Sequence, residues 1–141
     1  MARLTPESTP AEVRVAWVAA LRSGCHRQIA GRLQTDEGCC GMGVLCSLAV
    51  QAMVIPPPTR LKKGARVFAE SQILLPEAVK TWAGLRTRAG GYYHHTPANL
   101  VDDNDERGHS FNQLAETIES EPEGLLDEGW GGNDLSGGKA R

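Results

Sequence analysis

The stretch CCGMGVLC, residues 39–46, holds three of the four cysteines and is the densest group of reactive side chains in the chain. A structural zinc site normally uses two pairs of ligands, each separated by a few residues, so that one turn presents both atoms of a pair to the ion. Here Cys39 and Cys40 are adjacent, Cys46 lies among apolar residues, and the histidines are scattered. The spacing therefore does not predict a metal site.

The same cysteines can be considered as nucleophiles, which need an electropositive environment and a positioned histidine base. Cys46 lies between Leu45 and Leu48 and has the opposite surroundings. Cys40 can lie ahead of a helix N-terminus, where the helix dipole lowers a thiol pKa, but nothing in the sequence selects its base. We therefore expect the thiols to pack as small apolar groups, predict no catalytic residue and expect no enzyme.

A second group of polar residues covers positions 102–108, which read DDNDERG. Its carboxylates can bind calcium or magnesium, but the spacing and terminal Glu of an EF-hand are absent, so an acidic solvated loop is the alternative. Asn104 and Arg107 lie in this predicted loop, just before a predicted helix. Because helix N-termini favour anions, both are candidate ligand-binding residues.

Four helices are expected to position these groups. The pattern Thr9-Pro10-Ala11-Glu12 is a capping box that predicts a helix from about Pro10 to Ser23, and Ser110–Gln113 begins a second one that continues to Glu119. Residues 43–53 are apolar nearly all round and predict a buried helix, which the three prolines at 56–58 end. A short helix is predicted over residues 76–85.

Strand patterns are weaker. Residues 64–71 alternate roughly and predict a strand, while residues 86–100 predict a hairpin or long ordered loop with its tight turn at Gly90-Gly91. The pattern YYHH at 92–95 suits a ligand pocket, an oligomer interface, strand packing or simple exposure. The expected fold is α+β: a small antiparallel sheet flanked by about four helices in one domain over residues 9–124, with an N-terminal tail (1–8) and a mobile Gly-rich tail (125–141).

Composition limits the function classes. The chain has 141 residues and a formal net charge of −2, from 15 basic and 17 acidic residues, which argues against general binding of DNA or RNA. It has no apolar run long enough to cross a membrane and no apolar core of a secretory signal near its start. We expect a cytoplasmic protein with reduced thiols and no membrane partner.

Several short motifs occur in a recognisable order. They are Trp17-(2)-Ala20-Leu21-(1)-Ser23-Gly24, Arg27-Gln28-(2)-Gly31-(1)-Leu33, Gly43-Val44-Leu45-Cys46, Leu75-Pro76-(2)-Val79-(2)-Trp82-(1)-Gly84-Leu85, and Asn104-Asp105 before Gly108-(1)-Ser110-Phe111. Together they cover most of residues 17–124, and the chain resembles the first type of Thoeris anti-defence family of phage proteins. The family often reads CCLGVLC at its centre, so this chain departs from it: aligned on Gly43, Met42 replaces the leucine and Gly41 the second cysteine.

The resemblance implies a protein that binds and sequesters, without cleaving, the cyclic ADP-ribose isomers made by TIR-domain enzymes of the infected bacterium. It also implies a homo-oligomer without cofactors, and some relatives are expected to hold cyclic oligonucleotides. Such ligands call for aromatic stacking, arginine forks and amide donors. The candidate ligand-binding residues are Arg27, Gln28, Arg60, Phe68, Asn104 and Arg107. A core position for Phe68, and a solvated position for each arginine, are the alternatives.

A competing hypothesis is a phage-encoded inhibitor that acts by binding a host protein. It rests on the acidic segment 119–123 and on Trp130 in the Gly-rich end, which can become ordered on a partner. The two hypotheses differ in whether the target is a nucleotide or a protein surface.

Overall fold

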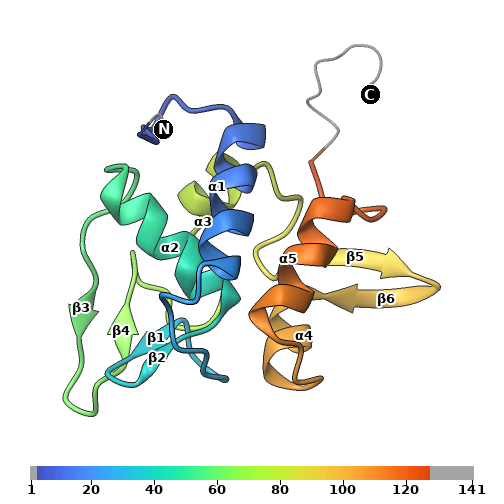
Figure 1. Cartoon of the computed structure of the whole chain (residues 1–141). Helices are drawn as coiled ribbons and strands as arrows, with labels where there is room; N and C mark the ends of the chain where they lie inside the picture. The colour runs from blue at the N-terminus through green and yellow to red at the C-terminus, as the bar shows by residue number, and fades with distance from the viewer. Residues whose placement is uncertain (1–2, 128–141) are drawn as a thin grey trace.

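The computed structural model describes residues 3–127, and Figure 1 shows how their elements are arranged. The helices are α1 (Pro10–Arg22), α2 (Gly41–Gln51), α3 (Glu77–Ala83), α4 (Leu100–Asp105) and α5 (Phe111–Ser120). The strands are β1 (Gln34–Thr35), β2 (Gly38–Cys39), β3 (Thr59–Arg60), β4 (Arg66–Val67), β5 (Gly91–His94) and β6 (Thr96–Asn99). Strands β1–β4 lie on one side of the central helices and the β5–β6 hairpin on the other (Figure 1), which confirms the predicted α+β class.

The strands form separate antiparallel pairs rather than one small sheet. Over the described residues, β1 pairs with β2, β3 with β4, and β5 with β6. The strand predicted over 64–71 is reduced to β4, because Phe68 and Ser71 exchange backbone hydrogen bonds across a tight turn. Pairs of two-residue strands have little stability of their own, so the packing of the helices carries the core.

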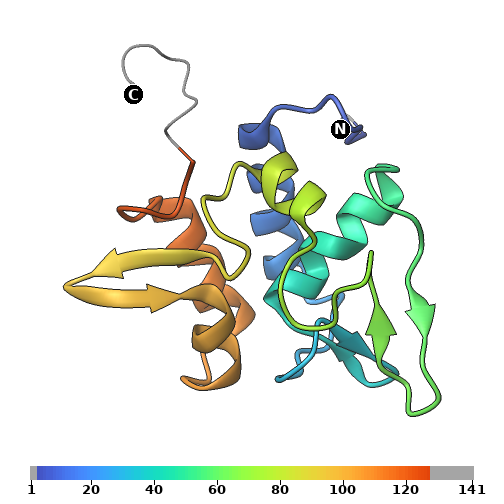
Figure 2. The same ribbon diagram turned by 180° about the vertical axis from the view of Figure 1, so that it is seen from behind.

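Helix α1 begins where the sequence predicts. The Thr9 hydroxyl accepts from the Glu12 backbone N–H, and the Glu12 carboxylate accepts from the Thr9 N–H. Trp17 lies on the buried face, where its indole N–H donates to the Gly41 carbonyl at 2.9 Å. Figure 2 shows α3 lying against α1 from behind, and α1 also packs against α2 and α5. It is therefore the central element of the fold.

Helix α2 contains most of the CCGMGVLC stretch. Cys40 is its N-cap, and the Cys40 sulfur accepts from the Gly43 backbone N–H at 3.4 Å. A Cβ atom on Gly43 would lie only 1.9 Å from the Leu33 carbonyl oxygen, so the helix can approach that backbone only with glycine at this position. Met42, Leu45 and other apolar residues of the helix are buried, which confirms the predicted buried helix.

Two predictions about the segment 86–108 are wrong. The hairpin turns at His95, which has a φ of 70°, and not at Gly90-Gly91, because His94 pairs with Thr96. Residues 100–105 form helix α4 rather than a polar loop, since the Asn99 side chain accepts from the Asp102 backbone N–H and caps it. Asn104 is therefore a helical residue that the structure buries.

The ends of the described chain contact the domain. The Trp82 indole donates to the Thr5 carbonyl at 2.9 Å, so part of the predicted N-terminal tail is held in place. Leu125 is fully buried, and Leu126 pairs with Leu85, so the packed part of the chain continues past residue 124. Residues 128–141, to which most of the predicted mobile tail and Trp130 belong, lie outside the described residues.

Over residues 3–127, no helix has both the length and the apolar character needed to cross a bilayer.

Candidate functional site

Two of the six candidate residues bind each other. The Gln28 side-chain nitrogen donates to the Asn104 Oδ1 at 2.7 Å and to the His109 carbonyl at 2.8 Å. The Asn104 Oδ1 also accepts from the Gly41 N–H, while its Nδ2 donates to the Ile29 carbonyl. These hydrogen bonds use the polar atoms of the Asn104 side chain inside the protein, so this side chain holds the fold together and does not open into a groove with Arg107.

Arg60 is held by an acidic neighbour that sequence reasoning did not identify. The Arg60 guanidinium donates two hydrogen bonds to Asp36, at 3.0 and 2.6 Å, and Arg66 donates a further one at 2.7 Å. These hydrogen bonds hold the pKa of Asp36 well below its ordinary value, and those from Arg60 have the largest effect. The three side chains join the β1–β2 and β3–β4 hairpins, and a ligand anion at Arg60 would have to compete with Asp36.

Neither Phe68 nor Arg27 lines the polar groove that contains Arg107. Phe68 is only 1% exposed and belongs to the core, so its ring does not present a face for stacking on a base. Arg27 is exposed, and its backbone carbonyl accepts from the Cys39 N–H at 2.9 Å. The six candidates therefore do not form one pocket.

Arg107 is the candidate that lines a polar groove. The groove has a volume of about 520 Å³ and lies between β5, the end of α4 and α5. Its lining residues are Tyr92, His94, Arg107, His109, Glu116, Thr117, Ser120 and Pro122. Half of the Arg107 side chain is exposed, so its guanidinium has donors free for a ligand in addition to a contact with Asp103.

A buried carboxylate organises the wall of this groove. Asp103 is 0% exposed, accepts a hydrogen bond from the Tyr92 hydroxyl, and lies 3.4 Å from the Arg107 guanidinium. The His109 Nδ1 lies 3.9 Å from the Asp103 Oδ2, and the His109 backbone N–H donates to the Asp103 carbonyl. Burial, followed by the hydrogen bond to Asp103, raises the pKa of Tyr92 to about 12, so the phenol stays neutral.

Sequence reasoning missed Asp103 and His109 as parts of one site. The short separation of Asp103 and Arg107, four residues, was a usable signal for a contact between them, although Arg107 follows the end of α4. For Tyr92 and His94, the sequence suggests a ligand pocket as one of several alternatives. It does not place them beside α5, because this position depends on how the β5–β6 hairpin packs. His109 enters the site through the turn that follows α4.

No cysteine lines the groove, and the three thiols of the CCGMGVLC stretch are buried, which does not favour their thiolate form. Burial raises the pKa of Cys39 and of Cys40 to about 11, and it raises the pKa of Cys46 further. The sequence predicts a lowered pKa for Cys40, because this residue lies ahead of the α2 N-terminus. Desolvation raises the pKa by more than the hydrogen bonds from the backbone N–H groups there lower it.

Over residues 3–127, no three His, Cys, Asp or Glu side chains gather in a way that could hold a metal ion.

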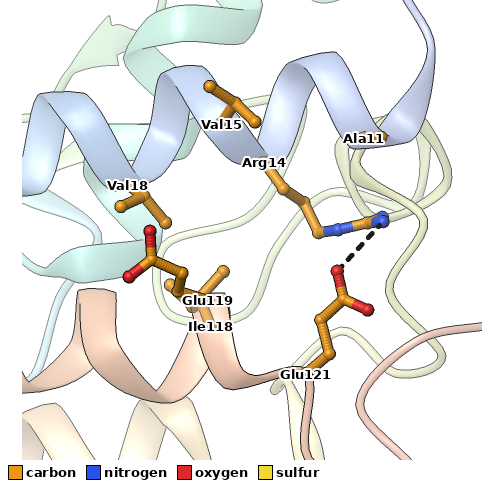
Figure 3. A pocket seen from close by; sticks show the side chains of 7 residues that line it. All are labelled: Ala11, Arg14, Val15, Val18, Ile118, Glu119 and Glu121. Carbon is orange, nitrogen blue, oxygen red and sulfur yellow. Dashed lines mark ion pairs between the residues drawn. The ribbon is translucent and has the colours of Figure 1, made fainter.

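A second, apolar hollow lies between α1 and α5. It has a volume of about 160 Å³, and Figure 3 shows the side chains around it: Ala11, Arg14, Val15, Val18, Ile118, Glu119 and Glu121. Val15 is 71% exposed at its edge. The Arg14 guanidinium lies 4.0 Å from the Glu121 carboxylate across the hollow (Figure 3). Glu119 accepts hydrogen bonds from Arg22, so the charges at the rim already have partners.

The sequence matches the model of a family described as a domain of unknown function (DUF8296) over residues 10–122, so the chain belongs to that family. No curated protein and no solved structure matches the chain. The matched region includes α1 to α5 and every residue that lines the polar groove.

Proposed function

We propose that this member of the DUF8296 family binds a cyclic ADP-ribose-type nucleotide in the polar groove and sequesters it without cleaving it. The observation that carries the proposal is the half-exposed side chain of Arg107, which lines a groove of about 520 Å³ together with His94 and His109. That volume is in the range of small-molecule sites, and an arginine with free donors suits a pyrophosphate. The nature of the nucleotide follows from the resemblance to Thoeris anti-defence proteins.

Binding without cleavage is supported by the state of the reactive groups. The thiols of Cys39, Cys40 and Cys46 are buried, and their raised pKa values keep them protonated near neutral pH. The buried carboxylate of Asp103 is bound by Tyr92 and Arg107 on the wall of the groove. A protein that holds its ligand without reacting with it needs hydrogen-bond donors and a cavity of suitable volume, and Arg107 and the groove of about 520 Å³ provide these.

The test is retention followed by recovery of the intact ligand. Purified protein in excess is mixed with cyclic ADP-ribose isomers, the protein is removed by ultrafiltration, and the ligand in the filtrate is measured. The proposal expects depletion of the filtrate and release of unchanged ligand when the protein is heat-denatured. Ligand that stays in the filtrate contradicts binding, and conversion to linear ADP-ribose would show an enzyme instead. Cyclic oligonucleotides, tested in the same way, define how wide the ligand class is.

The family resemblance also implies a homo-oligomer in the cytoplasm of an infected bacterium, and we include this in the proposal. Size-exclusion chromatography with light scattering measures the state directly. A dimer or larger assembly is expected at micromolar concentration. A protein that remains a monomer with and without ligand contradicts this part of the proposal.

A second candidate function is inhibition of a host protein, and the apolar hollow of Figure 3 favours it. An exposed valine beside an apolar floor is typical of protein interfaces, where the core is apolar and the rim carries paired charges. The variants Val15→Asp and Arg107→Ala separate the two functions in cells that carry a TIR-domain defence. Loss of phage protection with Arg107→Ala alone supports the nucleotide proposal, whereas loss with Val15→Asp alone supports the protein inhibitor.

A further inference from the structure

Arg107 can pair with a phosphate in the polar groove, but its single charge does not balance that of a pyrophosphate. With neutral histidines, the only positive group among the described residues that line the groove is Arg107, which lies 3.4 Å from the Asp103 carboxylate behind the wall, and Glu116 adds a second carboxylate to the lining. Tyr92 adds no charge, because its hydroxyl stays protonated. One guanidinium against two carboxylates leaves a small negative excess, and a pyrophosphate would add to it. The positive charge that balances the ligand must come from another group.

His109 is placed to supply that charge. Its Nδ1 is buried, lies 3.9 Å from the Asp103 Oδ2 and has no hydrogen-bond partner among the described residues. About a third of the side chain remains exposed, and the ring lines the groove. Because Nδ1 is the covered atom, the exposed edge of the ring is the one available to a ligand. A proton on each ring nitrogen would give Asp103 a cation on one side and the ligand a donor on the other.

The surroundings of His109 come from three elements. Asp103 lies in α4 and Arg107 just after it, Glu116 lies in α5, and Tyr92 and His94 lie in β5. Asp103 and Glu116 carry negative charge and Arg107 carries positive charge, whereas His94 carries charge only when it is protonated. A phosphate entering the groove would add a further negative charge near the ring and would pair with Arg107, so it shifts the balance toward imidazolium.

We propose that the groove takes up a phosphate-bearing ligand together with a proton on His109, and that Asp103 acts as the positioning residue for this imidazolium. The proposal rests on the proposed function, since it concerns the same groove. Imidazoles exchange their proton between about pH 5 and 8. Ligand affinity is therefore highest at the acidic end of this range and falls as the pH rises, approaching a tenfold loss per pH unit when one proton is linked to binding.

The direct test is isothermal titration calorimetry with cyclic ADP-ribose at pH 7.5 in buffers of different ionisation enthalpy, such as PIPES, HEPES and Tris. The apparent enthalpy is expected to change with the buffer in the sense of proton uptake, by close to one proton per ligand. His109→Gln should remove most of this uptake and flatten the pH profile. His95→Gln is the matched control, because His95 lies at the hairpin turn and does not line the groove.

The outcomes distinguish the two proposals. Saturable heat with the same enthalpy in every buffer overturns the proton-linked inference while leaving the binding function intact. Absence of binding by both calorimetry and ultrafiltration overturns the proposed function and this inference with it. Imidazole resonances in NMR spectra provide a second readout. In the wild type, the ligand should shift the titration of the His109 ring to higher pH. Equal titration of this ring with and without ligand contradicts proton uptake on His109. Circular dichroism checks that each variant is folded.

Discussion

The Gln28 side-chain nitrogen donates to the Asn104 Oδ1 at 2.7 Å, and this oxygen also accepts from the Gly41 N–H at 3.2 Å. Through these contacts, α4 is tied both to the segment that follows α1 and to the N-terminus of α2, although the residues are 76 and 63 positions apart. Asn104 therefore joins the two sides of the fold at a point where backbone N–H groups of α2 need acceptors.

Substitution of Asn104 by Ala should destabilise the protein by about 2–4 kcal/mol, because it removes several buried hydrogen bonds and leaves the Gly41 N–H unsatisfied. The free energy of unfolding from urea titration measures this. Asn112→Ala, an exposed position in α5, is the control and should change stability by less than about 0.5 kcal/mol. Equal stability of the two variants contradicts the structural role of Asn104.

The close approach of α2 to the Leu33 backbone makes a prediction for Gly43. Gly43→Ala should destabilise the protein by about 1–3 kcal/mol, since a Cβ atom would lie 1.9 Å from the Leu33 carbonyl oxygen, which already accepts from the Cys40 N–H and cannot move without losing this hydrogen bond. Ser47→Ala in the same helix is the control for helix propensity. Thermal unfolding of both variants tests this, and an unchanged midpoint for Gly43→Ala would show that the two segments are not in contact.

The cysteines should differ in their reaction with a thiol reagent. Cys25 is exposed and should react with DTNB at pH 8 within minutes, whereas Cys39, Cys40 and Cys46 are buried and should react only after denaturation. Burial also raises the pKa of Cys39 and Cys40 to about 11, so in the folded protein only a small fraction of these thiols is thiolate at pH 8. Fast labelling of more than one thiol in the native protein at pH 8 would contradict this burial.

The elements that sequence predicts well are those whose signals are local. The capping boxes at Thr9 and Ser110 mark α1 and α5 because the cap and its partner are three residues apart. Helix α4 was missed because its sequence, LVDDND, is rich in poor helix formers, and distant partners of Asp103 and Asn104 stabilise it instead. Local patterns do not contain those partners.

The same reasoning explains why the candidate site was predicted only in part. Arg107 was selected for its chemistry, and it does line the polar groove. Arg60 was selected on the same grounds, but the pairing with Asp36 joins residues 24 positions apart and has no signature in the sequence. Whether an arginine is free to meet a ligand depends on its neighbours in the fold, so residue type alone could not separate the two.

The contrast between these two arginines provides the most direct test of the proposed function. Binding of cyclic ADP-ribose should weaken at least about tenfold in Arg107→Ala, because a charge-assisted hydrogen bond contributes about 1.5–3 kcal/mol. Arg60→Ala also removes one positive charge, but the Arg60 guanidinium is already paired with Asp36 in the β3–β4 hairpin. The Arg60→Ala variant should therefore bind the ligand like the wild type. Calorimetry or retention by ultrafiltration at constant salt and pH measures all three proteins. A wild-type level of binding in Arg107→Ala, or no binding by the wild type, would contradict the groove as the ligand site.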